Sequence, residues 1–198
     1  MRKADSSLLG RAAAAFAVVA LFAGCGVSKQ QEGDSEKVTI ASPLGGLKVK
    51  TNIDPKDVGL GVYPGARLKP SEDSNRDKSA NVNMDTPFFK LKVVALDYLS
   101  DDAPEKVLAF YKQDMSRYGK VVECKGSKYQ SGSSVSVSDD DFKLKLNCDN
   151  ESGDRNSTEL KAGEGSKQHI VGITPSGTGT EFGLVFIELH GGKEGSAN

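Results

Sequence analysis

Residues 88–98 read FFKLKVVALDY, and the first half of this stretch alternates between apolar and charged side chains. Successive side chains of an extended chain point to opposite faces, so the apolar residues share one face while Lys90 and Lys92 share the other. Val94 and Leu96 then break the alternation, which indicates a strand that is covered on both faces. The stretch predicts the principal β-strand of the domain.

A helix is expected directly after this strand, over residues 103–118. Asp102 is a suitable N-cap, and Glu105 three residues later would complete a capping box. Gly119 stands where a left-handed residue commonly ends a helix. Apolar residues recur at three- and four-residue spacing and form one stripe, which predicts a helix packed on a sheet. The stripe consists of Val107, Phe110, Tyr111, Met115 and Tyr118.

Shorter strands are expected on both sides of this strand–helix unit. Alternating or apolar runs predict them at residues 47–51, 120–125, 142–148, 169–174 and 181–189, the last two forming a hairpin. The polar stretches 70–87 and 149–158 are predicted as loops, and 131–141 as a loop or weak hairpin. The order of strands, helix and strands predicts an α+β fold, an antiparallel sheet with one principal helix packed on one face, over residues 47–190.

The N-terminal residues predict a secretory signal peptide over residues 1–24. Three basic residues within the first eleven are followed by an uncharged run at 12–23, AAAAFAVVALFA. That run is shorter than the ~20 residues that a membrane-spanning helix needs. A basic start, a short apolar core and small residues before a break are typical of export signals. The alternative, a buried amphipathic helix, is disfavoured because the run is apolar on every face.

The stretch Phe22-Ala23-Gly24-Cys25 resembles the lipobox of bacterial lipoproteins, with Phe22 where that family usually has leucine. The resemblance implies that Cys25 becomes the first residue of the mature chain and carries a diacylglycerol and a further acyl chain such as palmitate. Gly26, in place of an aspartate, implies an outer-membrane protein that faces the periplasm. Residues 25–46 are polar at first and lack periodicity, which predicts a lipid-anchored flexible tether.

Two cysteines remain in the mature chain, Cys124 and Cys148. Export would place them in an oxidising compartment, where a disulfide is the default. Two buried thiols and half of a metal site are the alternatives. No further cysteine lies two to four residues from either of them, which disfavours a zinc site of the usual spacing.

The charge balance of the chain argues against a nucleic-acid partner. Removing residues 1–24 takes three of the 26 basic and one of the 27 acidic residues, so the mature chain has 23 basic and 26 acidic residues and a net charge of about −3. Nucleic-acid binding needs a basic surface. The same balance argues against docking on anionic headgroups, so the lipid alone is expected to anchor the protein.

Catalytic motifs are missing from the sequence. The chain contains neither the HExxH pattern of zinc proteases nor the GxSxG elbow of serine hydrolases. Its two histidines, His169 and His190, lie at the rims of the last predicted hairpin and could approach each other. They are interpreted as rim residues, with a general base or a metal pair as the alternative. No cofactor or resident metal is expected.

Two features are candidates for a binding surface. Asp139, Asp140 and Asp141 form an acidic run that could bind calcium weakly or simply be solvated. Tyr63 opens the segment Tyr63-Pro64-Gly65-Ala66, which together with Val107, Phe110 and Tyr111 resembles uncharacterised exported bacterial proteins that have a YPGA segment and a V-x-x-F-Y helix. The resemblance implies no activity, and the structural alternative for Tyr63 is a turn at the sheet edge.

The sequence therefore predicts a lipid-anchored protein of the cell envelope with a non-catalytic binding or scaffolding role. Its partners would be the membrane, through Cys25, and an envelope protein. The first alternative is a periplasmic small-ligand or metal-ion binder that uses the loops at 70–87 and 131–141. The second is an envelope hydrolase that uses His169 or His190. The C-terminal residues 191–198 are predicted to be a disordered tail.

Overall fold

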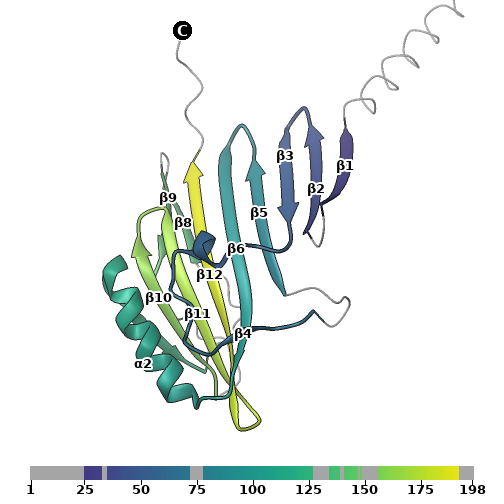
Figure 1. Ribbon diagram of the computed structural model, residues 1–198. Coiled ribbons are helices and arrows are strands. Elements are labelled where there is room, and N and C mark those ends of the chain that lie inside the picture. Colours follow the sequence, from purple (N-terminus) through teal and green to yellow (C-terminus); the bar gives the residue numbers. More distant parts are fainter. Residues whose placement is uncertain are drawn as a thin grey trace, which may run out of the picture.

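A long antiparallel sheet dominates the protein (Figure 1). The computed structural model describes residues 25–32, 35–71, 78–126, 134–138, 141–146, 148 and 156–191. Within these residues one sheet contains ten strands, and the only α-helix is α2, Pro104–Met115. The protein is thus a largely β fold with one helix. The predicted α+β class is wrong, because several strands lie in polar stretches where a tether and loops were expected.

The strands of the sheet follow one another in the order β1-β2-β3-β5-β6-β12-β11-β10-β7. Their bounds are β1 Gly26–Glu32, β2 Ser35–Ser42, β3 Gly45–Lys50, β5 Ser79–Asp85, β6 Phe89–Ser100, β12 Gly179–Gly191, β11 Lys167–Ser176, β10 Thr158–Glu164 and β7 Val122–Lys125. The short β4, Arg67–Leu68, also pairs with β6. Strands β8, Ser134–Ser138, and β9, Asp141–Lys145, form a separate hairpin. Two 3₁₀ turns complete the fold, η1 Pro55–Val58 and η2 Ser116–Tyr118.

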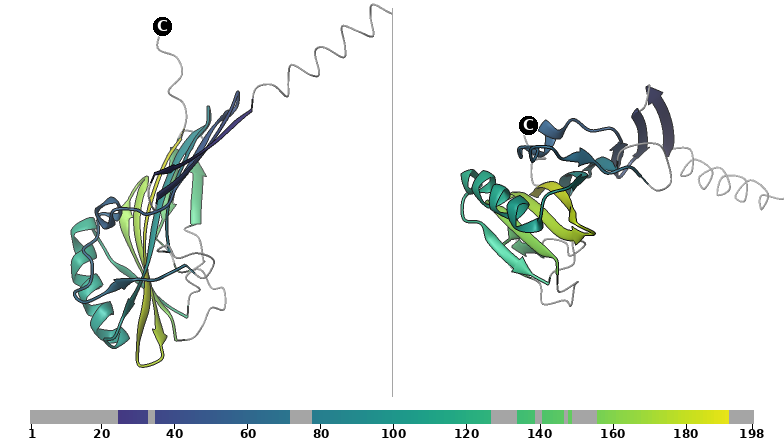
Figure 2. Two further views of the ribbon diagram at one scale, coloured as in Figure 1. Left: turned by 45° about the vertical axis from the view of Figure 1, so that its right-hand side comes forward. Right: turned by 60° about the horizontal axis from the view of Figure 1, so that its bottom comes forward.

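The hydrophobic core lies between α2 and one half of the sheet. Figure 2 shows α2 on one side of the sheet and the β8–β9 hairpin on the other. Tyr98 of β6 stacks on Phe182 of β12 at 5.4 Å between ring centres, and Tyr111 of α2 packs on the same Phe182 at 5.5 Å. Each fully buried side chain of this size stabilises the fold by about 2 kcal/mol. The other large members of this layer are Leu96, Met115, Leu160, Ile173 and Leu184.

The start of α2 differs from the predicted capping box. Ala103 is the N-cap, and no side chain caps this end. Asp102 instead accepts a hydrogen bond from the Tyr63 hydroxyl at 3.0 Å and from the Lys106 ammonium at 2.6 Å. Its carboxylate is therefore directed toward a neighbouring loop rather than toward the free N–H groups of the helix. The α-helix also ends earlier than expected: α2 stops at Met115 with Ser116 as its C-cap, and Gly119, with a φ of 105°, follows the 3₁₀ turn η2 instead.

Three predicted non-strand regions contain strands. Strands β1 and β2 occupy residues 26–42, where a flexible tether was expected, and β5 lies inside the predicted loop 70–87. Strand β10 begins at the end of the predicted loop 149–158. Strands β1, β2 and β5 bury little apolar surface, so their hydrophobic pattern is weak. Pairing with neighbouring strands stabilises them, and a single segment of sequence does not reveal its partners.

One end of the sheet forms a single layer, which we call the wing: β1, β2, β3, β5 and the first half of β6. No helix covers β1, β2, β3 or β5 (Figure 1), and none of the described residues in these four strands is buried. Residues opposite each other in an antiparallel ladder share a face. The face turned away from α2 is mainly apolar and also carries the Lys29–Glu36 ion pair on β1 and β2, and the face on the side of α2 is rich in lysine. The apolar face consists of Val27, Val38, Ile40, Leu47, Val49, Val82, Met84, Leu91 and Val93.

Candidate functional site

Cys25 lies at the outer edge of the wing, directly before β1. It is exposed and is not part of a disulfide. Gly26 pairs with Ala41 near the end of β2, so Cys25 lies at the end of the sheet where β2, β5 and β12 finish and β3 and β6 begin. We call this the Cys25 end. Within the described residues no helix has the length and hydropathy of a membrane span.

Two turns at the Cys25 end expose large apolar side chains. Leu44, in the turn between β2 and β3, is 76% exposed, and Phe88, in the turn between β5 and β6, is 72% exposed. The Thr86 hydroxyl accepts hydrogen bonds from the backbone N–H groups of Phe88 and Phe89 at 3.3 and 3.0 Å. The Ser42 hydroxyl likewise accepts from the N–H of Leu44 at 3.3 Å. Both apolar side chains are thus presented by turns with internal hydrogen bonds.

The two turns pack against each other at Gly45. This residue has a φ of 134°, and a Cβ atom there would clash with the carbonyl oxygen of Asp85 and stand 3.0 Å from the Cα of Thr86. Only glycine allows this backbone conformation together with so close an approach. Leu44 and Phe88 are therefore held on neighbouring turns at one end of the molecule.

An open depression of about 1300 Å³ lies beside these turns. Polar and charged residues make up much of its lining, among them Lys48, Asn83, Asp85, Lys90, Glu188 and His190. Glu188 pairs with His190 at 2.9 Å and with Lys167 at 3.1 Å. The His190 hydrogen bond is the main cause that lowers the pKa of Glu188. The depression is open to solvent and is lined by both charged and apolar residues, unlike the deep apolar pocket that would favour a small-ligand binder.

His169 is a packing residue. It is 6% exposed and stacks on the ring of Tyr118 at 3.7 Å. Burial and the positive charge of Arg117 lower its pKa to about 4, against the opposing effects of Asp114 and the Val58 backbone. Its Nδ1 has no hydrogen-bond partner among the described residues, so a proton at that atom would be buried without an acceptor. The imidazole is therefore neutral at neutral pH.

The two histidines do not form a pair. His169 lies opposite Phe186 of β12, whereas His190 lies opposite Lys90 of β6. Phe186 and His190 are four residues apart on one strand, which corresponds to about 13 Å. Among the described residues no three His, Cys, Asp or Glu side chains are grouped so that they could hold a metal ion. The alternative of a two-histidine base or metal pair therefore has no geometric support.

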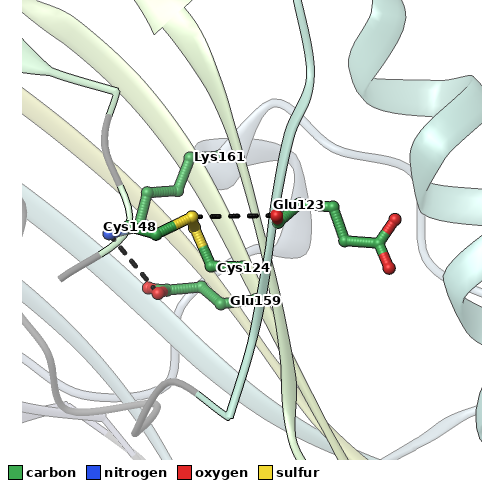
Figure 3. Close-up of a disulfide and its surroundings, with 5 residues drawn as sticks. All are labelled: Glu123, Cys124, Cys148, Glu159 and Lys161. Carbon is green, nitrogen blue, oxygen red and sulfur yellow. Dashed lines mark hydrogen bonds and ion pairs between the residues drawn. A yellow bond between two sulfur atoms is a disulfide. The ribbon is translucent and has the colours of Figure 1, made fainter. Parts of the chain in front are cut away.

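A disulfide joins Cys124 and Cys148, with 5.4 Å between their Cα atoms. It confirms the pairing expected from the cysteine count. Figure 3 shows it beside Glu159 and Lys161 of β10, which are both buried and form an ion pair at 3.4 Å. Strand β7 pairs with β10 and not with β9, so the two cysteines do not lie on neighbouring strands as expected. The bridge ties the segment after β9 to the edge of the sheet.

The remaining predicted site residues are dispersed. Tyr63 is 8% exposed, with its ring against Phe110 and Phe182 and its hydroxyl donating to Asp102. Burial is the main cause that raises its pKa. Tyr63 is therefore a core residue, and no binding role is needed to explain it. Asp139 and Asp140 lie outside the described residues, and Asp141 begins β9.

Leu44 and Phe88 were not among the site residues predicted from the sequence. The available signal was an apolar residue at each of two turns rich in proline and glycine, in Pro43-Leu44-Gly45 and Pro87-Phe88. Polar residues usually occupy such positions. No known protein family, curated protein or solved structure matches the chain. A function for this chain is therefore inferred from its own sequence and geometry.

Proposed function

We propose that this chain is an exported protein of the cell envelope, anchored at the outer membrane by lipid on Cys25, with a non-catalytic role in which the wing binds another envelope protein. The observation that carries the proposal is the wing itself, a single layer with one apolar face beside Cys25. A folded monomer leaves this face partly in contact with water. Contiguous exposed apolar surface of this kind marks interaction sites.

The edge of the wing supports the same proposal. Within the described residues β1 pairs only with β2, so one side of β1 offers its backbone N–H and C=O groups to a further strand. An extended segment of a partner could add to this edge by main-chain hydrogen bonds. Natural edge strands usually protect themselves with lysines or proline, and β1 contains one lysine, Lys29, which is paired with Glu36 at 2.7 Å.

The proposed anchoring is tested by metabolic labelling with an alkyne fatty acid, followed by mass spectrometry of the N-terminal peptide. The wild-type chain should carry label on Cys25 and fractionate with membranes, and a Cys25→Ser variant should carry none. A wild-type chain that is secreted without label would contradict the anchoring.

The proposed binding role is tested by cross-linking in intact cells with a matched pair of variants. Val49→Lys places a charge on the apolar face of the wing, and Lys48→Glu changes the neighbouring residue on the opposite face. A defined envelope protein should be cross-linked to wild type and to Lys48→Glu, and lost from Val49→Lys. Thermal unfolding of both variants checks that the sheet remains folded. Equal capture by the two variants would show that the apolar face of the wing does not bind the partner.

A second candidate function, binding of a small anion, is favoured by the depression at the Cys25 end. Lys48 and Lys90 line it, and neither forms an ion pair within the described part of the chain. Titration calorimetry with inorganic phosphate and with short-chain dicarboxylates tests this candidate. Binding that disappears in Lys90→Gln would support it.

A further inference from the structure

We propose that the turns bearing Leu44 and Phe88 insert into the surface of the lipid bilayer beside the lipid on Cys25 and hold the sheet upright on the membrane. This inference rests on the proposed anchoring and gives the protein a second, non-covalent membrane contact. It replaces the expectation that the lipid alone holds the chain at the membrane.

The strand register places the two turns level with the anchor. Gly26 lies opposite Ala41, so the next residue toward the chain start, Cys25, is level with Ser42 at the beginning of the β2–β3 turn. Gly46 lies opposite Asp85, at the start of the β5–β6 turn. No linker separates Cys25 from β1. A lipid on this cysteine would therefore bring both turns to the membrane surface.

The exposed residues have the chemistry of membrane insertion. Leu44 and Phe88 are among the most exposed large apolar side chains of the described residues, together with Val27 at 71% in β1, two residues after Cys25. Hydrogen bonds that the Ser42 and Thr86 hydroxyls accept from backbone N–H groups stabilise the two turns, and Gly45 lets them pack together. Little ordering is therefore needed when these side chains enter an apolar medium, which favours the transfer.

Charges near the turns are arranged to meet lipid headgroups. Lys90 lies opposite Asp85 at the start of β6, and Lys48 lies deeper on the same face of the wing. The described residues offer no ion pair to either lysine. With the turns inserted, the two lysines would lie at the level of the lipid headgroups, and Leu44 and Phe88 would lie below them in the acyl region. These two lysines share the lining of the depression with Asp85 and Glu188, and they lie here although the mature chain has a net charge of about −3.

Among the described residues, the β11–β12 turn at the opposite end of the sheet exposes no large apolar side chain. The β11–β12 turn consists of Gly177 and Thr178, and it lies one full length of β12 away from the Cys25 end, about 40 Å for a strand of this length. With the Cys25 end in the bilayer surface, this turn and the adjacent start of α2 would stand far from the membrane. The two ends of the sheet therefore make distinct predictions for a depth measurement.

The chain contains no tryptophan, so one introduced tryptophan reports a single position. Full-length lipidated Phe88→Trp and Thr178→Trp chains are reconstituted into vesicles of phosphatidylglycerol and acyl-brominated phosphatidylcholine. The fluorescence of Phe88→Trp should shift to the blue and be quenched by the bromine atoms, and that of Thr178→Trp should be unchanged. Circular dichroism of both chains checks that they remain folded.

Every outcome of this measurement decides the proposal. Absence of quenching in Phe88→Trp, or equal quenching in both chains, overturns it. The mass of the N-terminal peptide reports lipidation separately, so failure of the anchor is distinguished from failure of the contact. If the chain carries no lipid, the same two variants are mixed with the vesicles as soluble protein, and quenching confined to Phe88→Trp still supports insertion.

The strength of the contact is measured without the lipid anchor. In a Cys25→Ser background, the double variant Leu44→Ser/Phe88→Ser should lower partitioning to these vesicles about tenfold or more, because two exposed apolar side chains are lost. Val62→Ser is the matched control, since Val62 is 39% exposed and lies outside the wing. Equal partitioning of the double variant and the control would overturn the role of the two turns.

Discussion

At the scale of single residues, His169 shows that the sequence alone could not exclude a catalytic or metal-binding role for a histidine, even though the sequence lacks catalytic motifs. The sequence placed it correctly in the last hairpin but could not show that Tyr118 and Phe186 enclose its ring at 3.7 and 5.0 Å. Those neighbours come from η2 and from the paired strand, far away in the chain. Whether a histidine is a base or a packing residue is decided by such contacts, which no local pattern contains.

The low pKa of His169 predicts an acid-sensitive fold. Between pH 6.5 and about 4 the unfolded chain binds a proton at this residue and the folded chain does not, so the free energy of unfolding falls as pH falls through this window. The full loss would be about 3 kcal/mol. Denaturant titrations over this range should show a smaller loss for His169→Phe than for wild type. Parallel curves for the two proteins would contradict the assignment.

Because Lys161 and Glu159 form a buried ion pair, substitutions at the two positions should have strongly non-additive effects on the free energy of unfolding. Lys161→Met should lower the free energy of unfolding by about 3–5 kcal/mol, because it removes the cation that lies 3.4 Å from the buried Glu159 carboxylate. The double variant Lys161→Met/Glu159→Gln should recover part of that loss. Urea titrations of the single and double variants measure the coupling, and simple additivity of the two changes would argue against it.

At the scale of elements, the helices and strands that could be predicted from the sequence are those with a regular apolar pattern and a buried face. Strand β6 and helix α2 were predicted within a few residues, because each has a clear period and a buried face. Strands β1, β2 and β5 were missed, since their side chains are half-buried at most and their hydrophobic pattern is therefore weak, although β1–β2 and β2–β3 are pairs of consecutive strands. The candidate site was missed for the same reason, because it consists of the turns that follow β2 and β5.

Tyr111 of α2 is fully buried against Phe182, so an apolar and a charged substitution at this position should differ strongly in their effect on stability. Its hydroxyl accepts a hydrogen bond from the Tyr63 N–H at 3.3 Å, and burial is the main cause that raises its pKa. Tyr111→Phe should cost about 1 kcal/mol of stability for the lost acceptor. Tyr111→Asp should prevent stable folding, because it buries a charge without a partner. Thermal unfolding of both variants is the measurement, and a folded Tyr111→Asp would show that α2 can leave the sheet.

At the scale of the whole molecule, the sheet has a core half under α2 and an uncovered wing, joined through the long strands β6 and β12. Local stability follows buried contacts. Amide hydrogen exchange should therefore be faster in β1, β2 and β3 than in β6, β11 and β12. Uniform protection over all six strands would show that the wing is covered by something else in the protein.

The disulfide predicts a second global effect. Reduction of Cys124–Cys148 should lower the free energy of unfolding by about 3–4 kcal/mol on the chain-entropy description of a loop of this length. Guanidinium titrations with and without reductant measure the change, and a Cys124→Ala/Cys148→Ala variant should match the reduced protein. An unchanged midpoint would mean that the segment after β9 is ordered without the bridge.

The direction of β1 has a mechanical consequence. The strand starts at Cys25 and runs into the molecule, and seven residue pairs join it to β2. A pull on the proposed anchor along the strand axis would load all of these pairs together in shear, rather than opening them one after another like a zipper. Single-molecule extension from residue 25 should therefore require a higher rupture force along the strand than across it. Such an attachment would let the envelope transmit tension to the folded domain without peeling away its edge.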